Sequence, residues 1–127
     1  MRTIIILVNS IFSTDHEKGT DHWVAQRVTS VAMLPMTCLF FVFFFINFGL
    51  EYTQVRSYFT QPIVNSLTII FFLVTALHLK QGLEVVIEDY ISDIGARKKI
   101  KTINSVFCIL IALSSTCALL SLYFIGN

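Results

Sequence analysis

The residues of this chain that could do chemistry gather in one short stretch, ALHLKQGLEVVIEDY, which covers residues 76–90. The stretch begins inside an apolar run and still contains His78, Lys80 and Glu84. Ionisable side chains are costly in hydrocarbon and usually mark function when they occur in a membrane helix. We therefore ask first what each of these side chains could do there.

His78 lies about 14 Å from the inner end of a helix that would end near residue 87. At this depth an imidazole needs a partner: either a hydrogen bond to a neighbouring helix, or a metal ion, for which neutral imidazole is the commonest ligand. Gly82 follows one turn later on the same face and leaves a flat space, as a haem would require beside its axial histidine. Because His16 and His22 lie before the first predicted span and cannot reach the same depth, a second axial ligand would come from a partner subunit.

Lys80 and Glu84 are four residues apart on a different face of this helix. One interpretation is an ion pair near the inner end of the helix, with Lys80 snorkelling towards water. The other is a proton or cation relay that also uses Asp89, as in a small transporter subunit. The residues alone leave both open.

The composition of the chain favours a membrane protein of one domain. Of its 127 residues, 55% are hydrophobic and 13% are charged, and the mean hydropathy is +0.75. A net charge of +1 gives no basic field for nucleic acid. Cys38, Cys108 and Cys117 lie in apolar runs without metal-site or disulfide spacing, so we expect small buried hydrophobic side chains.

Three gaps in the charge pattern predict an all-α membrane protein with three transmembrane helices. The gaps lie after Arg27, after Arg56 and after Lys101, and each exceeds the ~20 residues that cross a bilayer. We place the spans at about residues 28–50, 63–87 and 103–124, within an anchor domain of residues 28–127. Residues 1–27 are expected to form an N-terminal segment at the inner face, because their apolar run is too short to cross and makes a poor signal peptide.

Lys and Arg in the connecting segments predict the orientation. The segment before the first span and the loop of residues 88–102 carry seven Lys or Arg between them, whereas the loop of residues 51–62 carries only Arg56. By the positive-inside rule the N-terminus and the second loop face inwards and the C-terminus faces outwards.

An antiparallel pair of the first two spans would bring Arg27 and Tyr90 to the same membrane face. Arg27 could hold a carboxylate such as a haem propionate, and Tyr90 could donate a hydrogen bond to a carbonyl such as that of a quinone. The ordinary alternatives are a positive-inside anchor for Arg27 and interfacial aromatic side chains for Trp23 and Tyr90.

The motif HWVAQRVTSVAMLP, followed by three spans with H-x3-G-x6-DY at the end of the second, resembles the hydrophobic membrane anchor of succinate dehydrogenase, which is the small cytochrome b component of that complex. The resemblance covers roughly residue 19 to the end of the third span. It implies half of a heterodimeric haem-binding bundle in an inner membrane, bacterial or mitochondrial. It also implies haem b shared with a second membrane anchor subunit (the cytochrome b large subunit). The bundle holds a flavoprotein and an iron–sulfur subunit, and electrons from succinate reach ubiquinone at the membrane boundary.

Site residues carry over from this resemblance one at a time. His78 matches the axial haem ligand, Arg27 an arginine near the haem propionates, Tyr90 the tyrosine that bonds the quinone, and Asp89 an acidic residue that supports that site. His22 falls where the family often has a polar residue at the pocket mouth.

Lys80, two residues after the matched histidine, departs from the family pattern. The chain has no flavin fingerprint or cysteine cluster, so by itself we do not expect an enzyme. A haem-free structural anchor and a fumarate reductase anchor remain alternatives to the succinate dehydrogenase anchor.

The charge pattern makes the topology testable. Reporter fusions at Gly95 and at Asn127 should report opposite sides of the membrane, with Gly95 inside. The reason is that the N-terminal segment and the second loop contain seven Lys or Arg, whereas the first loop contains one. Alkaline phosphatase and green fluorescent protein fusions measure this directly. Two fusions on the same side would rule out three spans.

Overall fold

The computed structural model describes residues 19–126, with side chains placed from 23 to 125, and this part of the chain forms four helices. They are α2 (Gly19–Asn47), α3 (Tyr52–Phe59), α4 (Pro62–Tyr90) and α5 (Ile94–Gly126). Of these, α2, α4 and α5 contain stretches long and apolar enough to cross a membrane, namely Trp23–Asn47, Pro62–Tyr90 and Ile94–Ile125. The predicted all-α class with three spans is confirmed, whereas α3 was not foreseen.

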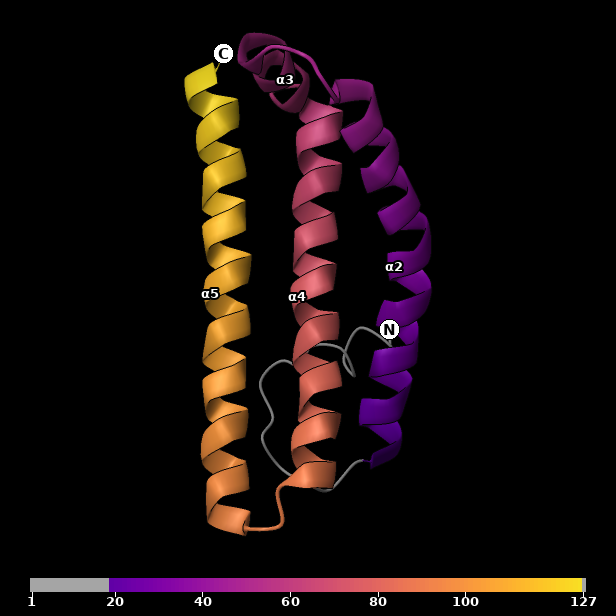
Figure 1. The fold of residues 1–127 in the computed structure, drawn as a ribbon, viewed down its shortest axis with the longest axis vertical. Coiled ribbons are helices and arrows are strands. Elements are labelled where there is room, and N and C mark those ends of the chain that lie inside the picture. Colours follow the sequence, from indigo (N-terminus) through magenta and orange to yellow (C-terminus); the bar gives the residue numbers. More distant parts are fainter. Residues whose placement is uncertain (1–18, 127) are drawn as a thin grey trace.

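Helix α4 is the central element of the bundle (Figure 1). It runs antiparallel to both neighbours and packs against α2 on one side and α5 on the other, while the short α3 lies at the end of the bundle near the C-terminus. Stacked rings of Phe40 and Phe71, with centroids 4.6 Å apart, join α2 to α4 in the half of the bundle nearest α3. Side chains on α4 therefore contact α2, α5 or, near its start, α3, or they face the outside of the bundle.

Local chemistry sets where the helices begin and end. Gly49 takes a positive φ of 81° just after α2, a conformation that glycine adopts without strain. The backbone N–H of Glu51 donates to Gln54 Oε1 at 3.3 Å and so opens α3. Pro62 starts α4, where its missing N–H costs nothing. The helix α2 continues through Pro35.

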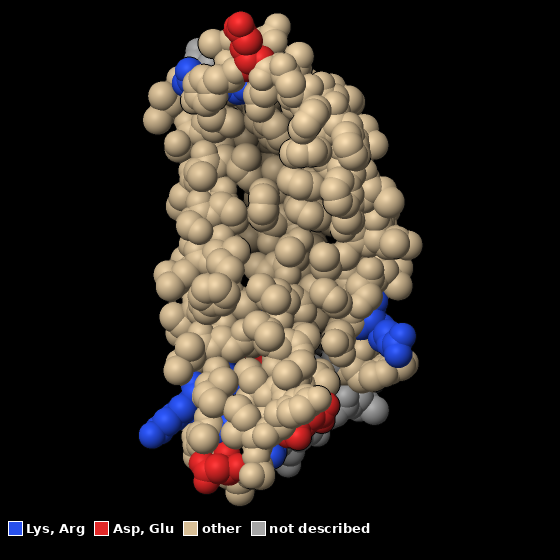
Figure 2. Space-filling view, in the orientation of Figure 1, with Lys and Arg blue, Asp and Glu red and all other residues tan. Residues whose placement is uncertain are grey.

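The turn between α4 and α5 is held by side chains. Asp93 Oδ2 accepts a hydrogen bond from the N–H of Ala96 at 2.6 Å and caps α5, and Arg97 Nε donates to the carbonyl of Ile91 at 2.8 Å. Lys101 pairs with Glu88 across the same turn. Figure 2 shows Lys, Arg, Asp and Glu side chains gathered around this end of the molecule, below a wide uncharged band.

Polar side chains tie α4 to α5 along the bundle. Asn65 Nδ2 lies 2.9 Å from the carbonyl of Leu119, and Asn104 Nδ2 lies 3.0 Å from the carbonyl of Lys80. Cys108 is buried beside Asn104, with its Sγ 3.6 Å from Asn104 Oδ1. Such bonds matter in hydrocarbon because no water can replace them.

The expectation of buried cysteines holds for one of the three. Cys108 is buried, as expected, but Cys38 and Cys117 are exposed on the surface of the chain. Both exposed cysteines lie on membrane-spanning helices whose outer faces are apolar, so hydrophobic sequence context predicted their surroundings but not their burial in this chain.

Lys80 and Glu84 form the predicted ion pair. Lys80 Nζ lies 3.0 Å from Glu84 Oε1, and the two side chains are only 5% and 11% exposed. The expected snorkelling of Lys80 towards water is wrong. The reason is its place on α4: the Lys80 backbone accepts from Asn104 of α5, and the side chain is enclosed near that contact rather than at the rim.

This burial predicts an asymmetric mutational response. Lys80→Ala or Glu84→Ala should each lower the stability of the chain by about 3–5 kcal/mol, because each removes one half of a buried ion pair. The double variant Lys80→Met/Glu84→Leu should recover most of that loss. Thermal unfolding of the detergent-solubilised chain measures both effects. Glu88→Gln, which breaks a partly exposed pair, is the control and should cost less than about 1 kcal/mol. Single variants no worse than this control would contradict a buried pair.

Candidate functional site

His78 lies on the side of α4 that faces α2. Its Nδ1 is 3.1 Å from Oγ1 of Thr29, a side chain that is buried in α2. The hydrogen bond to a neighbouring helix, one of the two expected kinds of partner, is therefore present. Within the described residues Nε2 makes no hydrogen bond, so one ring nitrogen is engaged and the other is available.

Thr29 also connects His78 to Gln81. Thr29 Oγ1 lies 2.9 Å from Gln81 Oε1, and Gln81 is the most buried large side chain described, at 1% exposure. Neither Thr29 nor Gln81 was predicted from the sequence as a partner of His78, because a threonine within a helix ordinarily bonds only its own backbone. The available signal was spacing: Gln81 is three residues after His78 and so shares its side of α4.

Gly82 opens a space beside the histidine. A Cβ atom placed on Gly82 would meet no atom within 4 Å. Glycine inside a helix costs about 1 kcal/mol relative to alanine, and nothing in the packing of the described residues requires that cost here. A histidine with an open, side-chain-free turn next to it fits a flat group such as haem.

Arg27 is exposed on α2, with its guanidinium carbon 5.2 Å from the centre of the Trp23 ring. The contacts of Thr29 with His78 and Gln81 fix the antiparallel register of α2 and α4. Counting two residues back along α2 places Arg27 level with Gly82. The arginine therefore lies at the depth of the open turn, where a cation–π contact leaves its N–H groups available.

Tyr90 is the last residue of α4 and is 85% exposed. In the same register it lies level with the start of α2, about 12 Å from the level of Arg27. Asp89 beside it is exposed as well. The structure thus places Arg27 and Tyr90 in the same half of the bundle but at different depths, with Arg27 at the level of Gly82 and Tyr90 at the end of α4.

The residues of the transporter alternative do not form one row. Lys80 and Glu84 are buried as a pair, whereas Asp89 is exposed at the end of α4. Among the described residues no group of three or more His, Cys, Asp or Glu could hold a metal ion. A metal bound at His78 would therefore need its other ligands from outside the described residues. The side chain of His22 lies outside the described residues.

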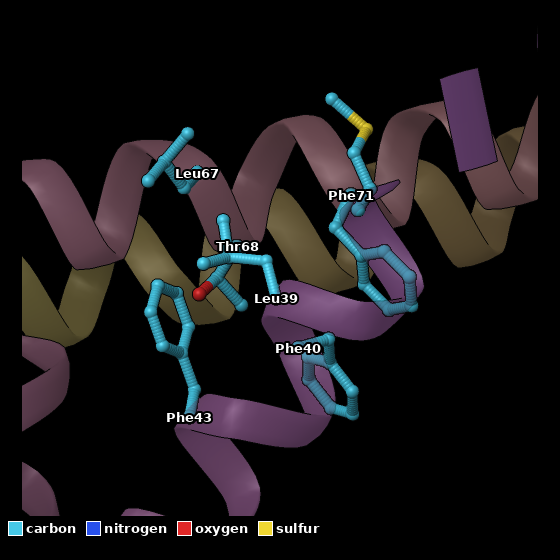
Figure 3. Close-up of a pocket in the computed structure, with 7 residues that line it drawn as sticks. Leu39, Phe40, Phe43, Leu67, Thr68 and Phe71 are labelled. Atoms are coloured by element: carbon cyan, nitrogen blue, oxygen red, sulfur yellow. The ribbon is translucent and has the colours of Figure 1, made fainter. Parts of the chain in front are cut away.

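A shallow pocket lies away from His78, between α2 and α4 in the half of the bundle nearest α3 (Figure 3). Its lining contains no ionisable side chain, and its one hydroxyl, that of Thr68, donates to the carbonyl of Val64 at 2.7 Å. The lining residues are Met36, Leu39, Phe40, Phe43, Leu67, Thr68 and Phe71. This pocket offers packing surface and no chemistry, so the candidate site is the region around His78.

Comparison with known proteins identifies the family of the chain. The family described as "Succinate dehydrogenase/Fumarate reductase transmembrane subunit" matches residues 8–119. A succinate dehydrogenase hydrophobic membrane anchor subunit of Rickettsia prowazekii (strain Madrid E) is 32% identical over 91% of this chain and 90% of its own length. A protein with the same description from Rickettsia typhi (strain ATCC VR-144 / Wilmington) is 30% identical over 82% of this chain and 83% of its own length. Another, from Paracoccus denitrificans, is 35% identical over 65% of this chain and 63% of its own length. No solved structure matches. The chain is a multi-pass membrane protein that belongs to the succinate dehydrogenase/fumarate reductase transmembrane subunit family.

Proposed function

We propose that this chain is a non-catalytic membrane anchor subunit of a succinate dehydrogenase, and that it provides one half of a haem b site and part of a ubiquinone site. The observation that carries the proposal is His78 on the central helix, with Nδ1 engaged by Thr29 and with the open turn at Gly82 beside it. The family membership and the names of the relatives support the same assignment.

In the proposed haem site His78 would hold the iron through Nε2, and a partner subunit would supply a further ligand. Gly82 leaves room for the face of the macrocycle, and Arg27, at the same depth, holds a propionate by charge-assisted hydrogen bonds. Bound haem supplies one-electron redox chemistry. The residues of this chain supply the orientation of the ring and the neutralisation of a carboxylate next to hydrocarbon.

In the proposed quinone site Tyr90 donates a hydrogen bond from its hydroxyl to a quinone carbonyl, and Asp89 helps to shape the site. Both side chains are exposed at the end of α4, where a membrane-soluble quinone could reach them. A phenol at this position suits the task, because its ring anchors at the interface while its O–H remains a donor.

The proposed partners are the cytochrome b large subunit, a flavoprotein subunit that oxidises succinate and an iron–sulfur subunit that passes the electrons on. The clustered charges at the α4–α5 turn would face the soluble subunits on the inner side of an inner membrane. In this arrangement residues 1–27 lie at the inner face and residues 28–127 form the anchor. The exposed apolar faces of the spans would meet lipid and the second anchor subunit.

The haem assignment predicts a spectroscopic loss. Replacing His78 with Ala should abolish the α-band of reduced haem in the assembled complex, because the iron loses an axial ligand. A reduced-minus-oxidised spectrum measures this. Gly82→Leu should also lower the haem content, since its side chain would fill the open turn, whereas the matched control Leu83→Ala, on an exposed face, should leave the band intact. An unchanged band in His78→Ala would refute the ligand, and a parent complex without haem would favour the haem-free anchor.

The quinone assignment predicts a selective defect. Tyr90→Phe removes one hydroxyl and should weaken quinone binding by about 1 kcal/mol or more, which lowers quinone reductase activity severalfold. Oxidation of succinate with a soluble dye, which takes electrons before the membrane, should stay near normal. The two activities are measured on the same purified complex. If both fall equally, the defect lies in assembly and Tyr90 has no role in the quinone site.

A further inference from the structure

We infer that Thr29, held in place by Gln81, is a positioning residue that fixes the tautomer of His78, so that Nδ1 carries the proton and Nε2 carries the lone pair. The consequence for haem rests on the proposed function above. The tautomer itself is a property of this chain and can be tested without haem.

The inference follows from counting protons around Thr29. Its hydroxyl carries a single hydrogen, and three oxygens lie within bonding distance: the carbonyl of Ala25 at 3.1 Å, the carbonyl of Gln26 at 3.0 Å and Gln81 Oε1 at 2.9 Å. All three oxygens can only accept, and Gln81 Oε1 is the nearest, so the hydroxyl hydrogen lies between Thr29 Oγ1 and Gln81 Oε1. The fourth contact, to His78 Nδ1 at 3.1 Å, then uses a hydrogen on the ring.

The orientation of the Gln81 amide carries this step. With Oε1 facing Thr29 at 2.9 Å, the hydroxyl hydrogen is used by Gln81, so His78 donates from Nδ1 and keeps its lone pair on Nε2. If the amide were turned so that its NH2 group faced Thr29, Gln81 would donate to Thr29 Oγ1 and the hydroxyl could donate to Nδ1, which would place the ring proton on Nε2. The position of the ring proton therefore also reports the orientation of Gln81.

Burial makes this arrangement selective. Thr29 is 4% exposed and Gln81 is 1% exposed, so water cannot easily replace either partner. In surroundings of low dielectric a ring that placed its proton on Nε2 would bring the lone pair of Nδ1 against the lone pairs of Thr29 Oγ1, with the hydroxyl hydrogen already used. The wrong tautomer would leave a buried polar contact unsatisfied and would be disfavoured.

The fixed tautomer has a defined effect on a metal at Nε2. A histidine that donates its other ring N–H to an oxygen is held in orientation and becomes a more basic ligand. A more basic axial ligand stabilises the ferric over the ferrous state and so lowers the reduction potential of the iron. Thr29 would thus affect both how tightly the haem is held and at what potential it works.

The first test uses the full chain without haem, labelled with 15N-histidine, at a pH at which the imidazole is neutral. The 15N shifts of His78, assigned by comparison with His78→Ala, should show hydrogen on Nδ1. Thr29→Val, which has nearly the same shape and no hydroxyl, should move the proton to Nε2, and Thr29→Ser should keep it on Nδ1. A proton on Nε2 in the parent chain overturns the inference whether or not the chain binds haem.

The second test uses the assembled complex. Thr29→Val should weaken haem retention by about 10- to 100-fold and raise the haem midpoint potential, and Thr29→Ser should restore both. If Thr29→Val leaves both unchanged while His78→Ala removes the haem, the positioning role is overturned and the haem site stands. If the parent complex holds no haem, the proposed haem function fails, and the tautomer measurement still decides the role of Thr29.

Discussion

The lack of water in hydrocarbon is the constraint on which the rest of this structure depends. A buried polar group that cannot reach water must find its partner within the protein, and α4, the central helix, carries several such groups. His78 and Gln81 find theirs on α2, through Thr29. Asn65 and the backbone of Lys80 find theirs on α5. Apolar packing alone would leave the rotation of α4 loosely defined, because every side of it is largely apolar, so these few polar contacts decide which side of α4 meets which neighbour.

The same contacts separate two kinds of chemistry along one helical stretch. Lys80 follows His78 by two residues, which is about 200° around the helix, so the ion pair with Glu84 points away from the histidine. This geometry explains how a lysine can stand so near a candidate metal ligand in sequence. Lys80 joins the packing of α4 and α5, whereas His78 and Gln81 contact Thr29 of α2. The departure from the family pattern at Lys80 therefore need not disturb a site on the other face.

Sequence alone predicted the fold class, the three spans and the Lys80–Glu84 pair. Each of these follows from residues close together in the sequence: the length of an uncharged stretch, or the four-residue spacing of two side chains on one helix. It failed where the outcome depended on a neighbouring helix. The burial of Lys80 was missed because only the position of α5 encloses it. Thr29 and Gln81 were missed because their contacts join residues that are far apart in sequence. Arg27 and Tyr90 were placed at one face by topology, but their different depths required the register that Thr29 sets.

The two sides of His78 differ in a way that bears on its role. On the Nδ1 side the chain itself supplies the hydrogen-bond partners: a buried threonine next to the ring, and behind it a buried glutamine and two backbone carbonyls. Elsewhere around the site lie Nε2, which makes no hydrogen bond among the described residues, a turn without a side chain at Gly82, and the exposed Arg27 level with that turn. A histidine that only joined two helices would need the contacts of Nδ1 and would gain nothing from the glycine. No described atom lies within 4 Å of a Cβ placed on Gly82. These features support the proposed site, which the chain orients through Nδ1 and which a flat ligand and a partner subunit would complete.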